Sequence, residues 1–242
     1  MKDNLTPKIV VKKRRLNIKR VFILALIIFL VCLVIYYSFK LRVSSISVSG
    51  NKYVSDSEII KSSHVLKSRF LTVSSSNACK KIKKNDFIDA CEIKKSWWLK
   101  IEIIVSENRP LFIYKETGNL ILSNGNQTDK KDIYGVPTLI NYVPNKILDK
   151  FISGLKSVDS DIIQSISEIE YTPSQNSDGD YIDEERFMLS MNDGNIVYIN
   201  TRNIKVLNKY EKIYASIGNK KGYFNFDADF GNYYFKEFDS EE

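Results

Sequence analysis

Apolar positions are distributed most unevenly at the start of the chain, where residues 21–39 form one continuous apolar run. These nineteen residues carry no charge, and Ser38 alone among them is not apolar. A helix rises about 1.5 Å per residue, so the run spans roughly 28 Å, close to the ~30 Å hydrocarbon thickness of a bilayer. We therefore predict a transmembrane helix over residues 21–39. No other apolar run in the chain approaches this length.

Shorter patterns predict a small domain over residues 43–112. Strict alternation of apolar and polar residues indicates strands, and Ser55 followed by Glu58 is a capping box that begins a helix. The predicted strands lie at 45–49, 91–94 and 99–106, and the predicted helices begin at Ser55 and near Ser76. The order strand–helix–helix–strand–strand is typical of a three-stranded sheet covered by two helices.

Residues 113–238 predict a second, mixed α/β domain, so the fold class is α+β outside a single span. Short strands are predicted at 111–114, 120–122, 166–171, 187–191, 196–199, 223–226 and 233–238, and amphipathic helices at 147–158 and 204–217. Pro137 makes residues 136–140 a loop or an edge strand, because proline lacks the N–H that a central strand needs. Residues 239–242 form an acidic stub at the C-terminus.

The distribution of charge along the chain indicates a protein that lies in a membrane rather than one that binds nucleic acid. The net charge is +7, yet residues 1–42 hold ten Lys and Arg against one acidic residue, so the basicity belongs to one end. Seven cations between Lys8 and Arg20 precede the apolar run, and only Lys40 and Arg42 follow it closely. The positive-inside rule therefore predicts a type II protein, with residues 1–20 as a basic cytoplasmic tail and the bulk of the chain outside the cell.

The end of the apolar run distinguishes an uncleaved membrane anchor from a cleaved signal. A cleaved secretory signal is the alternative to an anchor, but its apolar region is shorter and ends in small residues, whereas this run ends in Tyr-Tyr-Ser-Phe-Lys. We favour the uncleaved anchor.

A change of net charge marks a boundary farther along the chain, where residues 43–114 carry a net charge of +5 and residues 115–242 a net charge of −7. This change, just after Arg109-Pro110, supports a boundary between the two external domains.

Reactive side chains are sparse. His64 is the only histidine, and a Ser–His or Cys–His site would have to be built on it with Cys79 or Cys91 as the thiol. No recognised signature surrounds it, so we expect a surface or capping histidine. One histidine and two external cysteines at these spacings match no zinc site. Cys79 and Cys91 are read as buried free thiols, with a disulfide as the alternative.

Two charged segments are candidate binding sites. The acidic residues between Asn176 and Glu185 offer oxygen ligands for calcium, but their spacing does not match an EF-hand, so a solvated loop is favoured. The lysine run at 80–84 offers contacts to an acidic wall polymer or to lipid headgroups, and a solvated helix end is favoured over both. We therefore predict no catalytic residue, no metal, no cofactor and no small-molecule substrate.

The C-terminal aromatic strand is the strongest candidate for a functional site. Along it, Tyr233 and Phe235 point to one face, and Tyr234 and Lys236 point to the other. A last strand is often an edge, which offers unpaired N–H and C=O groups to a partner strand. The alternative is that its own domain covers both faces. The predicted partner-binding residues are Gly231, Tyr233, Tyr234, Phe235 and Phe238.

In this order of segments the chain resembles the FtsQ/DivIB family of bacterial cell-division proteins. The residues that carry the resemblance are Ile46, Val48, Gly50, Asn51, Val54, Ser55, Glu58 and Ile59, and then Trp97, Trp98, Ile101, Ile103, Val105, Glu107 and Pro110. Downstream, residues 120–125, 136–140, 193–199 and 205–217, with 223–226 and Gly231, are similar to the family's β-domain. Trp98 stands where the family usually has proline, and Ala228 where an aromatic residue is expected.

The resemblance implies a polypeptide-transport-associated (POTRA) domain over residues 43–112 and a β-domain over residues 113–238. It also implies a non-enzymatic scaffold, enriched at the division septum, that binds FtsL-type and FtsB/DivIC-type proteins and regulates septal peptidoglycan synthesis. In that family the partner pairs with the last strands of the β-domain. Two alternatives remain open: an anchored cell-wall hydrolase or transpeptidase that uses Cys79 or Cys91 with His64, and a POTRA component of a secretion system.

Overall fold

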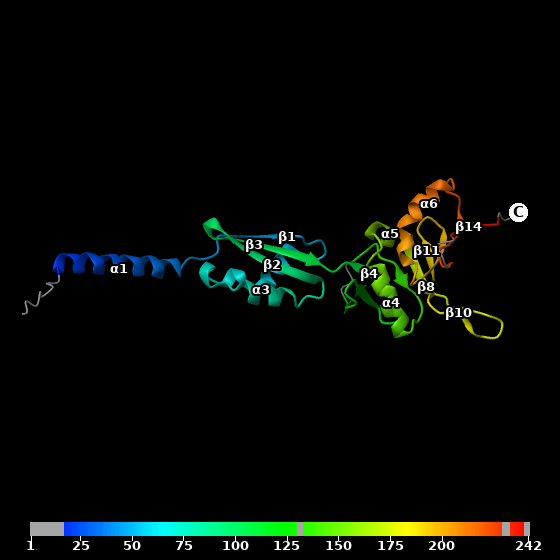
Figure 1. Ribbon diagram of the computed structural model, residues 1–242, viewed down its shortest axis with the longest axis horizontal. Helices are drawn as coiled ribbons and strands as arrows, with labels where there is room; N and C mark the ends of the chain where they lie inside the picture. Colours follow the sequence, from blue (N-terminus) through cyan, green and yellow to red (C-terminus); the bar gives the residue numbers. More distant parts are fainter. Residues whose placement is uncertain (1–16, 130–132, 229–232, 240–242) are drawn as a thin grey trace, which may run out of the picture.

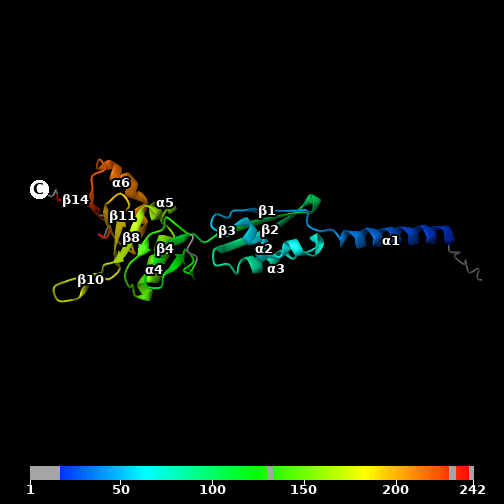
Figure 2. The ribbon, with the colours of Figure 1, turned by 180° about the vertical axis from the view of Figure 1, so that it is seen from behind.

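The computed structural model describes residues 17–129, 133–228 and 233–239, arranged as a helix followed by two domains along one long axis (Figure 1). Most of the predicted basic tail, most of the acidic stub and the candidate residue Gly231 lie outside the described residues. The view from behind shows the same succession of helix, first domain and second domain (Figure 2).

The first element, α1 (Ile18–Ser38), agrees with the predicted span. Within the described residues it is the one helix that is long and apolar enough to cross a membrane, and none of its side chains is buried in the protein. It begins three residues before the predicted run because Lys19 and Arg20 continue the helix. Long charged side chains are good helix formers, so the helix is longer than its apolar part.

The first domain has the predicted order of strands and helices. A three-stranded sheet has the order β1-β3-β2, in which β3 pairs with β1 in parallel and with β2 antiparallel. Its elements are β1 (Ser45–Ser49), α2 (Asp56–Ser63), η1 (Val65–Lys67), η2 (Phe70–Thr72), α3 (Ser75–Ile82), β2 (Ile88–Ser96), η3 (Trp97–Leu99) and β3 (Lys100–Glu107). Ile59 of α2, Ile82 of α3 and Ile103 of β3 are fully buried together in its core.

Half of the predicted capping box is present. The Ser55 hydroxyl accepts a hydrogen bond from the Glu58 N–H at 3.3 Å, as expected for an N-cap. The Glu58 carboxylate does not complete the box, because it accepts a 2.8 Å hydrogen bond from the Asn85 side chain instead. This bond connects the start of α2 to the turn after α3, so a residue expected to act locally holds two segments together.

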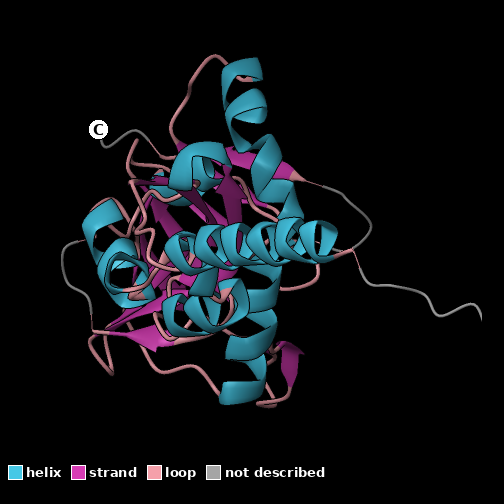
Figure 3. Cartoon of the chain, turned by 90° about the vertical axis from the view of Figure 1, so that its left-hand side faces the viewer, coloured by secondary structure: helices cyan, strands magenta, loops and turns pink. Residues whose placement is uncertain are grey.

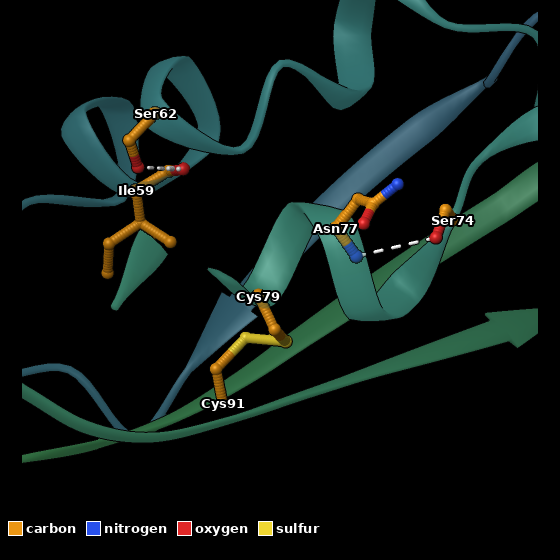
Figure 4. Close-up of a disulfide and its surroundings, with 6 residues drawn as sticks. All are labelled: Ile59, Ser62, Ser74, Asn77, Cys79 and Cys91. Atoms are coloured by element: carbon orange, nitrogen blue, oxygen red, sulfur yellow. Dashed lines mark hydrogen bonds between the residues drawn. A yellow bond between two sulfur atoms is a disulfide. The ribbon is translucent and has the colours of Figure 1, made fainter. Parts of the chain in front are cut away.

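The preference for free thiols was wrong. Cys79 of α3 and Cys91 of β2 form a disulfide, with their Cα atoms 5.5 Å apart (Figure 4). Local spacing could not settle this pairing, because it depends on how α3 packs on the sheet. A cross-link that closes a loop of this size removes conformational freedom from the unfolded chain and stabilises the fold by about 3 kcal/mol.

Glu107, at the end of β3, holds the turn after β1. Its carboxylate accepts hydrogen bonds from the N–H groups of Lys52, Tyr53 and Val54 at 2.7, 2.7 and 2.9 Å. The turn begins at Gly50, whose φ of +87° and close approach to the Val105 carbonyl leave no room for a Cβ atom. A carboxylate that accepts several backbone N–H bonds makes the strong, charge-assisted kind.

The second domain is built on a nine-stranded sheet with the order β14-β13-β12-β11-β8-β7-β4-β5-β6. Its strands are β4 (Pro110–Tyr114), β5 (Asn119–Leu122), β6 (Gln127–Thr128), β7 (Thr138–Leu139), β8 (Ile166–Tyr171), β11 (Arg186–Met191), β12 (Ile196–Asn200), β13 (Gly222–Asn225) and β14 (Tyr234–Glu237). Its helices are α4 (Asn145–Leu155), α5 (Ser160–Gln164), η4 (Ile204–Lys209) and α6 (Tyr210–Ser216). Figure 3 distinguishes the helices and strands of this α+β architecture.

One face of this sheet packs against the helices to form the second core. Phe151 of α4 stacks on Phe187 of β11 with ring centroids 4.0 Å apart and lies 6.1 Å from the ring of Phe112 in β4. All three rings are completely buried. Side chains that alternate with the core residues, such as Met188 and Tyr198, are only half-buried on the other face.

The junction between the domains is a shared hairpin. Leu111 and Phe112 of β4 belong to the second core, so the predicted border between residues 112 and 113 falls inside β4. In β5, Leu120 and Leu122 pack in the first core instead. Arg109, just before β4, donates hydrogen bonds to three backbone carbonyls at the end of α4, those of Leu155, Lys156 and Val158.

Three local predictions need correction. Residues 138–139 form β7 in the interior of the sheet, paired in parallel with β4 and β8, not a loop or an edge strand. This is possible because Pro137 precedes the paired residues. The predicted helix at 204–217 starts as the 3₁₀ helix η4 and becomes α6 only at Tyr210. The acidic segment forms a hairpin of β9 (Ser174–Gln175) and β10 (Tyr181–Asp183), which pair antiparallel.

We predict that Glu107→Ala destabilises the first domain. The change leaves three backbone N–H groups without their acceptor, and a hydrogen bond to a charged group contributes roughly 1.5–3 kcal/mol. Urea unfolding of the detergent-solubilised chain, followed by far-UV circular dichroism, measures the loss. Glu102→Ala, an exposed glutamate on the same strand, is the matched control. Equal unfolding midpoints for the two variants would contradict this role.

Candidate functional site

The C-terminal strand β14 lies at an edge of the large sheet, as the sequence predicts. It pairs antiparallel with β13 through four residue pairs, from Gly222 opposite Glu237 to Asn225 opposite Tyr234. Among the described residues β13 is its only strand neighbour, since β14 ends the strand order. The edge lies at the end of the molecule farthest from α1 (Figure 1).

The backbone of β14 presents hydrogen-bonding groups to this open edge. The Phe238 N–H donates to the Lys221 carbonyl at 3.1 Å, which fixes the alternation of the antiparallel ladder. Residues 234 and 236 therefore direct their N–H and C=O groups toward β13. Those of Phe235 and Glu237 point away from the sheet. These are the groups that an added strand would pair with.

The side chains of β14 alternate between two faces in the predicted way. Phe235 packs on Phe224 with ring centroids 5.0 Å apart, and Tyr233 packs on Phe226 at 5.4 Å, so both belong to the core face. Tyr234 on the other face is 61% exposed. The core face thus fixes the strand, while Tyr234 remains available for contact.

Part of the other face is covered within the domain. Phe238 makes an edge-to-face contact with Tyr223 at 4.8 Å, and Tyr223 stacks on Tyr198 at 6.3 Å. The Arg186 guanidinium lies 4.0 Å from the Tyr198 ring centroid, a cation–π contact that ends the row. Of the five predicted partner-binding residues, three therefore pack on their own domain and one, Tyr234, is mainly exposed. Gly231 lies outside the described residues.

Gly222 allows β14 to pair closely with β13, and sequence reasoning missed it. A Cβ atom at this position would collide with the Lys236 carbonyl and would lie 2.7 Å from the Phe235 ring and 2.8 Å from the Glu237 Cα. Real Cβ atoms do not make such contacts, so the edge strand requires glycine here. The residue gave no signal in the sequence because a glycine at the start of a strand resembles a turn residue.

A buried polar network positions the start of β13, and it was also missed. The Gly222 N–H donates to the Asn195 side-chain oxygen at 2.9 Å, and the Asn195 amide donates to the Tyr210 hydroxyl at 2.8 Å. The Tyr210 hydroxyl in turn donates to the Asp193 carboxylate at 2.6 Å. Burial, and then the bond to Asp193, raise the pKa of Tyr210 well above its usual value, so it remains a neutral donor. The network connects the β11–β12 turn, α6 and β13.

A second set of polar contacts holds the segment that follows β13. Arg186 and Asp227 form an ion pair at 2.6 Å, and the Asn200 amide donates to the Asp227 carbonyl at 2.8 Å. Asn203 donates to the Ala228 carbonyl at 2.9 Å. Side chains from β11, β12 and the turn after β12 therefore hold Asp227 and Ala228, the two residues at the end of the described segment that follows β13.

The other candidate sites are not assembled in the described part of the chain. Both thiols of the proposed Cys–His pair are engaged in the disulfide, and His64 is an exposed residue that caps the end of α2, as expected. No group of three or more His, Cys, Asp or Glu residues able to hold a metal is found among the described residues. Of the candidate sites considered from the sequence, the sheet edge at β14 is the one that the described residues assemble.

Comparison with known proteins gives consistent similarities. The family model of the FtsQ-type POTRA domain matches residues 41–108. Over 242 residues the chain is 31% identical to the cell division protein DivIB of Bacillus subtilis (strain 168), covering 94% of this chain and 86% of that protein. It is 28% identical over 227 residues to DivIB of Pediococcus pentosaceus, covering 87% of this chain and 59% of that protein.

A solved structure is also similar in part. It is the major extracytoplasmic domain of DivIB, in its trans isomer, from Geobacillus stearothermophilus. The match has a TM-score of 0.37 at 22% sequence identity and covers 47% of this chain and 97% of that chain.

We predict that Gly222→Ala loosens β14 while the rest of the sheet stays folded. Overpacking costs about 1–3 kcal/mol, which corresponds to roughly 5- to 150-fold faster amide exchange. Hydrogen–deuterium exchange at Tyr234 and Lys236, whose N–H groups face β13, measures the effect, with β11 and β12 as internal references. Lys221→Ala at the exposed neighbouring position is the control. Unchanged exchange in β14 would show that glycine is not required.

Proposed function

Because the chain belongs to the DivIB family of cell division proteins, we propose that it is a non-enzymatic scaffold of the division machinery. It has one membrane span, an external POTRA domain at residues 43–112 and a β-domain at residues 113–238. The observation that supports a binding role is the open edge of β14, with outward backbone groups at Phe235 and Glu237 beside an exposed Tyr234. A partner strand added there would extend the nine-stranded sheet.

The partners that we propose are the small single-span proteins of the FtsL type and the FtsB/DivIC type. By binding them outside the membrane, the chain regulates septal peptidoglycan synthesis. Strand addition suits such partners because backbone hydrogen bonds supply affinity, and the side chains beside the edge supply selectivity. Tyr234 and Lys236, both exposed, are the side chains that contact the partner on the open face.

A type II orientation supports this role. The excess of Lys and Arg before α1 favours a cytoplasmic N-terminus, so both domains lie outside the cell, where septal wall is made. A disulfide between Cys79 and Cys91 suits this oxidising side of the membrane.

The alternative of an anchored Cys–His enzyme has less support. A cysteine nucleophile reacts as the free thiolate, and the disulfide engages both external sulfurs. His64 lies on the surface, with its Nδ1 atom 2.8 Å from the Ser62 carbonyl and no acid to orient the ring among its described contacts. A scaffold needs neither group.

We predict that Glu237→Pro weakens partner binding without unfolding the β-domain. The Glu237 N–H points away from β13, so proline removes no bond within the sheet but blocks pairing at the open edge. Loss of edge hydrogen bonds, at about 0.5–1.5 kcal/mol each, together with the steric block should weaken binding at least tenfold. Affinity capture of the FtsL-type and DivIC-type proteins by the full-length chain in detergent measures the change.

Glu237→Ala is the matched control, because it removes the same side chain and its 2.8 Å ion pair with Lys220 but keeps the N–H group. Circular dichroism of both variants confirms that each is folded. Capture by Glu237→Pro at the level of Glu237→Ala would eliminate strand addition at this edge.

Septal localisation is tested by a fluorescent protein fused to the N-terminus. The full-length chain should form rings at midcell. A fusion that ends after residue 42 keeps the span but lacks both external domains, so it should stain the cell periphery evenly. Even peripheral staining by the full-length fusion would exclude a role at the septum.

A further inference from the structure

The end of the first domain that faces α1 carries exposed apolar side chains that the division function does not explain. Three short segments meet there: the linker 39–44 after α1, the 3₁₀ helices η1 and η2, and the turn η3 between β2 and β3. The Ser44 N–H donates to the Leu99 carbonyl at 2.9 Å, and the Phe70 N–H donates to the Leu41 carbonyl at 3.0 Å. We call this end of the domain the proximal tip. It lies next to the end of α1 in both opposite views (Figures 1 and 2).

The proximal tip exposes both tryptophans of the chain. Trp97 is 89% and Trp98 is 86% exposed, and Leu66 of η1 and Leu71 of η2 are 66% and 47% exposed. Tryptophan is a large side chain that is usually well buried in water-soluble domains. Two adjacent, nearly fully exposed indoles therefore indicate a contact with something other than water.

The backbone holds these side chains outward at a cost. Trp98 and Leu99 have φ values of +65° and +60°, the left-handed region that residues with a Cβ atom rarely adopt. Such a conformation costs roughly 1–2 kcal/mol per residue. Because the Leu99 carbonyl accepts the bond from Ser44, the turn is fixed to the linker after the span.

The tip is strongly basic. Residues 39–44, 65–72 and 95–100, which form it, contain no Asp or Glu but carry Lys40, Arg42, Lys67, Arg69, Lys95 and Lys100. Arg42 and Arg69 are even paired across an antiparallel backbone bridge. Neither has an acidic partner among the described residues. Like charges directly opposite one another repel, so this arrangement favours an anionic ligand between or beside them.

The length of the linker places the tip at the membrane surface. Leu41 is three residues past the end of α1 at Ser38, and an extended chain reaches at most about 3.5 Å per residue. Phe70, bonded to Leu41, is thus within roughly 10–15 Å of the end of the span. The headgroup layer on each side of a bilayer is ~5–8 Å thick. The linker therefore keeps the tip within reach of the lipid headgroups.

We propose that the proximal tip docks on the outer surface of the bilayer that α1 crosses. Trp97 and Trp98 insert their indoles at the level of the headgroups, where amphipathic rings are favoured, with Leu66 and Leu71 beside them. Arg42, Arg69 and their basic neighbours bind anionic headgroups. Docking fixes the angle between the first domain and the membrane, and it thereby holds the β14 edge away from the membrane surface. The proposal requires α1 to span a membrane but not the partner binding proposed above.

Intrinsic fluorescence tests this directly, because every tryptophan of the chain lies in the tip. The full-length protein is reconstituted in vesicles of phosphatidylcholine with phosphatidylglycerol, with or without bromine atoms on the acyl chains. Bromine quenches only indoles that reach the bilayer. We expect brominated lipid to remove most of the emission and the unbrominated vesicles to give a blue-shifted spectrum.

The matched control moves the reporter to the other domain. The triple variant Trp97→Ser, Trp98→Ser, Tyr181→Trp has a single indole in β10, at a position that is 56% exposed. Its emission should stay at solvent wavelengths and resist brominated lipid. Wild-type emission that matches this control would overturn the proposal and leave the tip as a surface for a protein.

The role of charge is tested in the same assay. Arg42→Ser with Arg69→Ser should reduce quenching in vesicles that contain phosphatidylglycerol, and it should have little effect in pure phosphatidylcholine. Equal quenching of wild type and double variant in both lipids would remove the anionic-headgroup part of the proposal. Affinity capture of the FtsL-type and DivIC-type proteins in detergent, where no bilayer exists, should be unchanged by Trp97→Ser. Failure of docking is therefore distinguishable from failure of strand addition.

Discussion

A helix of 21 residues without one buried side chain sets the constraint from which the rest of the molecule follows. Such a surface is stable only in lipid, because each apolar side chain left in water costs about 1.5–3 kcal/mol relative to burial. The span therefore fixes one end of the chain in the membrane. The two domains together have a near end, rich in cations and tryptophan, and a far end that carries an open sheet edge.

The path between these ends is stiffened by a few contacts rather than by one large core. Glu107 holds the turn after β1, and Arg109, two residues later, holds the end of α4. The hairpin of β4 and β5 then contributes Phe112 to one core and Leu122 to the other. The first domain and the sheet consequently share residues at their junction. Because of this connection, the orientation of the first domain at the membrane also determines where β14 lies.

The strand β14 shows how an exposed sheet edge is stabilised. An edge strand has only one neighbour, so half of its backbone groups make no sheet hydrogen bonds. Phe235 compensates by packing on Phe224, and Gly222 permits the close approach that this packing requires. The buried Asn195 and Tyr210 side chains then hold the start of β13 in place through hydrogen bonds. The fold thus orders the strand through its core face, while the outward backbone groups stay outside the sheet ladder.

Sequence periodicity by itself determined the span, the order of elements in the first domain, most strands of the second and the two faces of β14. These features depend on the spacing of side chains within one segment, where a helix repeats every 3.6 residues and a strand every two. Tertiary structure alone decided the Cys79–Cys91 bridge, the interior place of β7, the need for glycine at 222 and the hydrogen bond between Leu99 and the linker after α1. Each of these depends on which distant segments pack together, and local pattern carries no information about long-range pairing.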